Sequence, residues 1–177
     1  MEYIKWIETP LGRALLSSDG ESLTGFWFED QKYFAATLED ERCEKELPIF
    51  DRTQEWLDIY FQGKCPDFMP PMAPKGSAFR KKVWEYLCAV PYGQVTTYGA
   101  IAQQMAEAMG RQTMSGQAVG GAVSHNPISL LIPCHRVVGA NNSLTGYAGG
   151  LEKKLRLMAL EKIDADRFFV PKKGTAL

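Results

Sequence analysis

The segment Pro66-Asp67-Phe68-Met69-Pro70-Pro71-Met72-Ala73-Pro74-Lys75-Gly76 decides how this chain of 177 residues is divided. Its four prolines lack a backbone N–H, and they restrict the residues before them to extended conformations. We therefore predict a linker over residues 66–76 that crosses the surface between two domains, residues 1–65 and 77–177. A chain of this length can form two small domains, each with a modest core.

The formal charge changes sign at the same place. Residues 1–76 hold 8 Lys and Arg and 15 Asp and Glu, a balance of −7, whereas residues 77–177 hold 12 and 6, a balance of +6. Such asymmetry favours a basic binding module joined to an acidic unit, as in proteins that bind nucleic acids. Chance segregation of solvated charge would give the same counts, so charge alone does not assign a function.

The residues before the linker predict strands followed by a helix. Asp19-Gly20 is typical of a hairpin turn between β-favouring segments around Arg13–Ser17 and Leu23–Phe28. Over Thr53–Phe61 the aromatic and aliphatic residues share one helical face, and Gly63 can end that helix. These aromatic residues indicate a core, and no catalytic grouping is evident among them.

The residues after the linker predict short helices. An apolar stripe over Phe79–Leu87 is typical of a helix that stops before Pro91. Thr97 can cap a second helix that ends near Gly110, and Ser115–Val123 favours a third. Two short helices joined by a tight turn are typical of a helix-turn-helix, although many helical pairs that bind nothing share the pattern.

The third of these helices is unusually rich in glycine. Gly116, Gly120 and Gly121 each cost about 1 kcal/mol of helix propensity relative to alanine. Tight packing against a neighbouring helix is one explanation. The other is that a smooth Ala/Gly face enters the minor groove of DNA, which is only about 6 Å wide.

A cysteine and a histidine are adjacent downstream, after the apolar run Leu130-Leu131-Ile132, which we predict to be a buried strand. Cys134 needs to become a thiolate to attack carbon, and a neighbouring imidazole can lower its pKa or accept its proton. In an extended strand the side chains of Cys134 and His135 would point to opposite faces. The two residues can cooperate if Pro133 imposes a turn, or if a water bridges them.

A third group would orient the histidine. Downstream, an apolar stripe marks the buried face of a helix and ends at Glu161; its members are Leu151, Leu155, Met158 and Ala159. Most glutamates in such a position are solvated, so the pattern alone assigns Glu161 no role.

These motifs resemble one known family, the O6-alkylguanine-DNA alkyltransferases (methylated-DNA–protein-cysteine methyltransferases). The central string is Ile132-Pro133-Cys134-His135-Arg136-Val137, and the resemblance covers nearly the whole of residues 77–177. Further matching strings are Phe79…Val83-Trp84, Val90-Pro91-Tyr92-Gly93, Thr97-Tyr98-Gly99, Ala118-Val119-Gly120-Gly121, Asn126-Pro127 and Gly146-Tyr147…Gly149-Gly150-Leu151. The resemblance implies an α+β architecture, with a ribonuclease-H-like α/β domain and a mostly helical, winged-helix-like domain that carries the helix-turn-helix.

The resemblance also implies roles for matching residues. Cys134 is expected to accept the alkyl group, and His135 to deprotonate it through water. Glu161 is expected to orient that histidine, Tyr98 to push a phosphate aside and protonate the guanine, and Asn126 to brace the active-site turn. The expected substrate- and DNA-binding residues are Gln117, Ala118, Gly120, Arg136, Val137, Tyr147 and Ala148.

Three departures from the family pattern matter. Gln117 stands where an arginine often fills the gap left by the extruded base, so we expect base flipping to survive with weaker DNA affinity. Ala148 stands where some members carry a serine that donates to O6, so backbone donors should replace it. Some members hold zinc in the first domain, but its ligands are absent here.

The implied function is direct repair of DNA: each molecule transfers one alkyl group from O6-alkylguanine to Cys134 and is inactivated, with O4-alkylthymine as a second candidate substrate. The alternatives are a non-catalytic damage sensor, against which Cys134 argues, an alkylation-sensing regulator and a cysteine hydrolase. The expected partner is double-stranded DNA containing the lesion, bound by a monomer without cofactor or metal, since only His125 and His135 could join cysteines around zinc. Dispersed cysteines, and the lack of a signal peptide or long apolar run, favour the cytoplasm and exclude a membrane partner.

Overall fold

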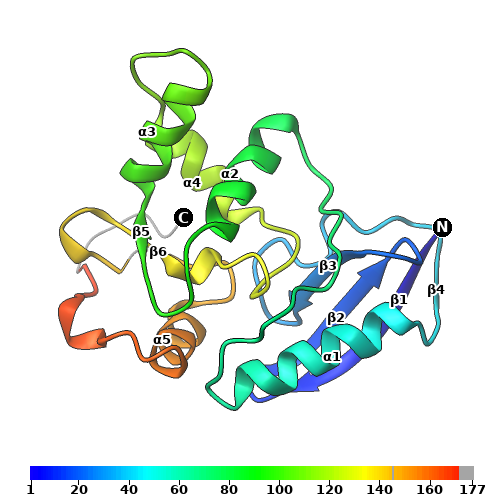
Figure 1. Cartoon of the computed structure of the whole chain (residues 1–177). Helices are drawn as coiled ribbons and strands as arrows, with labels where there is room; N and C mark the ends of the chain where they lie inside the picture. Colours follow the sequence, from blue (N-terminus) through cyan, green and yellow to red (C-terminus); the bar gives the residue numbers. More distant parts are fainter. Residues whose placement is uncertain (145, 172–177) are drawn as a thin grey trace. The chain divides into compact units, whose positions relative to one another are not determined.

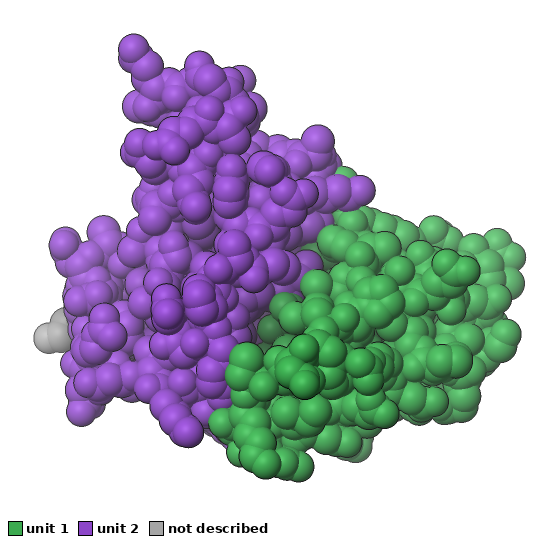
Figure 2. All heavy atoms as spheres, viewed as in Figure 1, with its two compact units in different colours: residues 1–76, 127–131 green, residues 77–126, 132–177 purple. Residues whose placement is uncertain are grey.

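The computed structural model describes residues 1–144 and 146–171, which form two compact units (Figures 1 and 2). Unit 1 comprises residues 1–76 together with 127–131, and the described part of unit 2 comprises residues 77–126, 132–144 and 146–171. Unit 2 therefore begins at Ser77, where the charge balance changes sign. Among the described residues, no helix is both long and apolar enough to span a bilayer.

Unit 1 is built on a mixed four-stranded sheet in the order β3-β2-β1-β4. The predicted hairpin is formed by β2 (Gly12–Ser18) and β3 (Leu23–Phe28), which pair antiparallel. The sequence analysis did not predict β1 (Glu2–Thr9), which pairs antiparallel with β2, or β4 (Arg42–Glu44), which pairs parallel with β1. The whole of β3 is buried, so it lacks the alternation of a half-exposed strand.

Helix α1 (Pro48–Phe61) lies alongside this sheet (Figure 1). It begins five residues before the predicted start, because Pro48 occupies the first turn, where its missing N–H costs no hydrogen bond. Trp56 and Tyr60 are buried, and their rings stack 5.1 Å apart. Trp56 and Tyr60 are therefore core residues, as predicted, whereas Phe61 is half-buried.

Two extended segments cover the outer edge of β3. The N–H of Leu23 donates to the carbonyl of Pro71, and the N–H of Ala73 donates back to Leu23, both at 2.8 Å. Further along the strand, Phe26 donates to Pro127 at 2.8 Å and accepts from Ser129 at 2.9 Å. Part of the predicted linker thus pairs with the sheet, and residues 127–131 protect an edge that would otherwise expose unpaired backbone groups.

Unit 2 contains the predicted helices, α2 (Ala78–Cys88), α3 (Tyr98–Ala108) and α4 (Gly116–Ser124). Each begins after a hydroxyl residue whose side chain accepts a backbone N–H of the first turn: Ser77, Thr97 and Ser115. The indole of Trp84 on α2 donates to the carbonyl of Ala122 on α4 at 2.8 Å. This contact fixes α4 against α2, and α3 also packs against α4, as in the predicted helix-turn-helix.

The remainder of unit 2 forms a second layer of short elements. A two-residue strand β5 (Thr96–Thr97) pairs parallel with β6 (Val137–Val138). The other elements are the 3-10 helices η1 (Cys134–Arg136), η2 (Ala140–Asn142) and η3 (Ala165–Arg167) and the helix α5 (Leu151–Leu160). Their common core consists of Val138, Leu144, Met158, Ile163 and Phe168.

Candidate functional site: a buried cysteine beside a histidine–glutamate pair

Cys134 lies at the start of η1, at the end of a sequence of tight turns. The expected strand over Leu130–Ile132 is wrong, because Leu130 adopts a positive φ of 73° and the N–H of Leu131 closes a turn onto Ser129. The N–H of Cys134 then closes a second turn onto Ile132 at 2.8 Å. The chain therefore turns at Pro133, and Cys134 and His135 do not lie on an extended strand.

Asn126 holds this turn from inside unit 2. Its Nδ2 group donates to the carbonyl of Ile132 at 2.8 Å and to the Sγ atom of Cys134 at 3.3 Å. Cys134 is only 4% exposed, and burial raises the pKa of its thiol, while the Asn126 hydrogen bond and the charge of Lys154 oppose that rise. The resting residue is therefore a thiol, and it needs a base to become a nucleophile.

His135 and Glu161 form a pair whose side chains have no exposed surface. The Nε2 atom of His135 hydrogen-bonds to Oε2 of Glu161, which follows the last residue of α5. Burial alone would raise the pKa of Glu161, but the hydrogen bonds and charges of His135 and Arg136 lower it to about 2. Burial has the largest single effect on His135 and lowers its pKa; Glu161 opposes this, Arg136 and Lys154 reinforce it, and the net pKa is lowered. At neutral pH the pair is thus a neutral imidazole beside a carboxylate.

This protonation state makes His135 a base. The ionised Glu161 can only accept a hydrogen bond, so Nε2 of His135 carries the hydrogen and the basic lone pair lies on Nδ1. An oriented imidazole with a neighbouring carboxylate is the arrangement that activates a nucleophilic thiol.

Arg136 does not lie where a DNA-binding side chain would be expected. It is 9% exposed, its Nε donates to Oε1 of Glu161 at 2.7 Å, and its Nη1 donates to the carbonyl of Val90 at 2.8 Å. The N–H of Gly93 donates to the same Oε1 at 3.0 Å. The backbone of the segment Val90-Pro91-Tyr92-Gly93 therefore contacts both Arg136 and the carboxylate of Glu161.

The thiol borders a narrow hollow that has no room for a water molecule, lined by Tyr98, Val123, Ser124, Cys134, Gly146, Tyr147 and Ala148. Tyr98, at the first position of α3, donates from its hydroxyl to the carbonyl of Gly146 at 3.4 Å. The ring of Tyr147 faces His135 with 6.5 Å between the ring centroids. A Cβ on Gly149 would come within 2.6 Å of the Tyr147 ring, so a larger residue at position 149 would displace that ring.

Two families of known domains match the chain in order. Residues 3–74 match the ribonuclease-like domain of 6-O-methylguanine DNA methyltransferase, and residues 78–163 match the DNA-binding domain of that protein. The chain belongs to the 6-O-methylguanine DNA methyltransferase family. The predicted fold class is confirmed, because the mixed sheet of unit 1 and the helices of unit 2 are its two domains.

Relatives in this family resemble the chain over most of their length. The methylated-DNA–protein-cysteine methyltransferase of Haemophilus influenzae is 40% identical over 162 residues, which cover 91% of this chain and 87% of the relative. The protein of the same name from Mycobacterium leprae is 38% identical, with 92% and 93% covered. A Mycobacterium tuberculosis structure in complex with DNA is similar with a TM-score of 0.78 at 32% identity, covering 94% of each chain.

Within the matched DNA-binding domain, α4 divides its small residues between two faces. Gln117 and Ala118 are exposed, and a Cβ on Gly116 or Gly121 would meet nothing within 4 Å. Gly120, predicted to face DNA, is instead buried together with Val119, Ala122 and Val123. The two explanations for the glycines of this family member therefore apply to different residues: Gly120 serves packing, and Gly121 keeps the outer face smooth.

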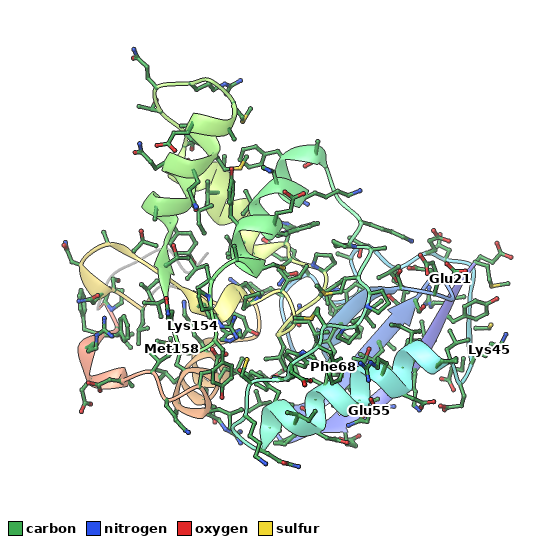
Figure 3. The ribbon with its side chains drawn as sticks, in the orientation of Figure 1. Glu21, Lys45, Glu55, Phe68, Lys154 and Met158 are labelled. Carbon is green, nitrogen blue, oxygen red and sulfur yellow. The ribbon has the colours of Figure 1, made fainter. Side chains whose placement is uncertain are left out.

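One predicted residue of the site, Val137, and one residue that was not predicted, Lys154, lie in contact with each other. Val137, expected to line the base pocket, is buried in β6 and does not border the hollow, and its carbonyl accepts from Nζ of Lys154 at 2.5 Å. Lys154 projects from α5 with no exposed surface, and burial lowers its pKa to about 8 (Figure 3). The sequence analysis missed it, since a single lysine within an amphipathic helix gives no signal of burial.

Val123 and Ser124 are the other lining residues that the sequence analysis missed. They lie at the end of α4, and the apolar Val123 fits the buried face of that helix as well as a pocket wall. The order of the residues alone cannot show that the end of α4 meets the turn before Cys134.

Proposed function

We propose that this protein repairs DNA by transferring the alkyl group on O6 of a guanine to the Sγ atom of its own Cys134. The observation that carries the proposal is a single buried thiol that borders a hollow next to an imidazole–carboxylate pair. Membership of the 6-O-methylguanine DNA methyltransferase family supports the same chemistry. Among the described residues, no group of three or more potential His, Cys, Asp or Glu ligands is assembled for a metal ion.

The transfer begins with removal of the thiol proton. Nδ1 of His135 accepts it, through a bridging water, and the ionised Glu161 stabilises the resulting imidazolium. Because the pKa of His135 is lowered, the imidazole is in the accepting form at neutral pH. Because the pKa of Cys134 is raised, the thiolate is generated only when the base acts.

The thiolate then displaces the alkylated oxygen. A bond forms between Sγ of Cys134 and the alkyl carbon, the bond between that carbon and O6 breaks, and its electron pair stays on the guanine. Tyr98, which lines the hollow, donates a proton from its hydroxyl that neutralises the departing guanine. The product is a stable thioether on Cys134, so each molecule acts once.

The substrate has to leave the double helix before it can reach Cys134. A base inside a duplex is inaccessible, and its extrusion costs a few kcal/mol, less for a weakened pair. The exposed face of α4, with Gln117, Ala118 and Gly121, is smooth enough for the minor groove, and Gln117 is long enough to fill the vacated space. Double-stranded DNA bound by a monomer is therefore the proposed partner, with Tyr147 and Ala148 as walls of the base pocket.

Intact-mass spectrometry after reaction with an oligonucleotide containing O6-methylguanine tests this proposal. The wild-type protein should gain one methyl group, Cys134→Ala should gain none, and Cys88→Ala, which removes an exposed cysteine of α2, should react like the wild type. Binding of the lesion by the wild-type protein without any gain of mass would show a damage sensor instead. Methylation of a cysteine other than Cys134 would refute the assignment of the acceptor.

A further inference from the structure

We propose that Arg136 is a positioning residue for His135, the proton acceptor. From inside the protein it holds Glu161 and balances the charge of that carboxylate, and it does not contact DNA. This inference rests on the proposed function, because it assigns Arg136 to the same proton-accepting unit. It replaces the interpretation that the sequence favoured, in which Arg136 belongs to the DNA-binding residues.

The contacts of Arg136 divide the carboxylate of Glu161 between two partners. Arg136 Nε occupies Oε1 at 2.7 Å, and His135 occupies Oε2. The N–H of Gly93 adds a second donor to Oε1 at 3.0 Å. Glu161 is thus fixed in rotation about its last bond, and the imidazole that it orients is fixed with it.

The other end of the guanidinium anchors this unit to a second segment of the chain. Nη1 of Arg136 donates to the carbonyl of Val90 at 2.8 Å, and the guanidinium carbon lies 5.8 Å from the centre of the Tyr92 ring. Tyr92 in turn donates to the carbonyl of Leu160, one residue before Glu161. The planar fork of an arginine can make these bonds together, whereas a lysine ammonium can make them only as a point charge.

The charges that face the histidine give Arg136 an electrostatic role as well. The groups around His135 are the carboxylate of Glu161, the cations of Arg136 and Lys154, the thiol of Cys134 and the ring of Tyr147. Burial is the main reason that the pKa of His135 is lowered, Glu161 opposes it, and Arg136 and Lys154 reinforce it. Arg136 therefore keeps Glu161 ionised without allowing the carboxylate to hold a proton on the imidazole.

A phosphate contact would conflict with this geometry. Arg136 is 9% exposed, and drawing its guanidinium out to a phosphate would leave the buried carboxylate of Glu161 without a strong donor. A positioning role and a phosphate-binding role for Arg136 therefore predict different effects of its substitution on two quantities. One is the salt dependence of DNA affinity, and the other is the pH dependence of the alkyl-transfer rate.

Arg136→Gln separates them. We expect single-turnover alkyl transfer at pH 7 to slow about tenfold on duplex DNA and on the small substrate O6-benzylguanine alike. Both reactions need His135 as the proton acceptor, and the substitution removes a hydrogen bond that holds its partner Glu161. The acid limb of the pH–rate profile should move to higher pH, since removing a cation raises the pKa of His135. Affinity for an unmodified duplex, and its dependence on salt, should not change. Arg136→Lys should return the acid limb toward its wild-type position, and Arg156→Gln, at an exposed site on α5, is the matched control.

Two results would overturn the inference: a salt dependence that falls by about one released counterion in Arg136→Gln, as for a lost phosphate contact, or an acid limb that stays in place. If this variant does not fold, the Nε–H resonance of Arg136 in the wild type decides. It should stay protected from exchange, with an unchanged shift, when unmodified DNA binds; exposure or a large shift would contradict the proposal. This measurement needs no alkyl transfer, so failure of the proposed function, seen as no methylation of wild-type Cys134, is a separate outcome.

Discussion

The ammonium group of Lys154 lies inside unit 2, 2.5 Å from the carbonyl oxygen of Val137 and with no exposed surface on its side chain. Val137 follows η1 directly, so this bond ties α5 to the turn that carries Cys134. A buried cation is costly unless it is paired or hydrogen-bonded. The hydrogen bond to the carbonyl of Val137 therefore partly offsets the cost of burying the ammonium group.

This buried lysine should give the protein a characteristic dependence of stability on pH. Burial lowers the pKa of Lys154 from 10.5 to about 8 in the folded state. Between these values the unfolded chain binds a proton that the folded chain has lost, so stability should rise with pH, by on the order of 3 kcal/mol in total. Urea unfolding at pH 7.5 and pH 10 should show this rise in the wild type and not in Lys154→Met. Lys153→Met on the same helix is the control, and an equal rise in Lys154→Met would disprove the attribution.

Asn126 should matter for both stability and rate. Asn126→Ala leaves the buried carbonyl of Ile132 without its donor and should lower the free energy of unfolding by about 1–3 kcal/mol. It also removes the hydrogen bond that opposes the raised pKa of Cys134, so alkyl transfer should slow by about tenfold. Urea unfolding and single-turnover kinetics check the two effects. Gln104→Ala, at an exposed site of α3, should change neither, and a full rate in Asn126→Ala would refute its role at the thiol.

The two adjacent glycines of α4 should respond in opposite ways to added bulk. Gly121→Leu has open space and should fold with normal stability, yet bind duplex DNA at least tenfold more weakly because the smooth face is lost. Gly120→Leu, at the buried face, should lower the melting temperature instead. Thermal melts and fluorescence anisotropy at two salt concentrations distinguish them. Unchanged DNA affinity in folded Gly121→Leu would exclude insertion of this face into a groove.

Gln117 should act on duplex DNA alone. If its side chain fills the space left by the extruded guanine, Gln117→Ala should slow repair of duplex DNA because nothing then opposes return of the base. It should scarcely affect O6-benzylguanine, which requires no extrusion, and Gln117→Arg should maintain or improve duplex repair by adding attraction to phosphates. Single-turnover rates on the two substrates decide the matter. Equal slowing on both, or on neither, would mean that Gln117 has no part in extrusion.

The sequence by itself determined the elements whose signals are local. Periodic apolar residues and hydroxyl caps are short-range patterns, so α2, α3 and α4 could be placed from the chain alone. The hairpin of β2 and β3 followed from its Asp-Gly turn. The string around Cys134 indicated the family because its order and spacing are specific, and the family matches agree with it.

The tertiary structure decided what depends on residues far apart in the chain. The expected strand at Leu130–Ile132 failed because turns stabilised by Asn126 and by pairing of Ser129 with Phe26 outweigh an apolar run. The roles of Arg136 and Lys154 were equally hidden. From local sequence alone, a charged side chain is predicted to be exposed to solvent. Its burial depends on hydrogen-bond and charge partners that only the packed fold places beside it.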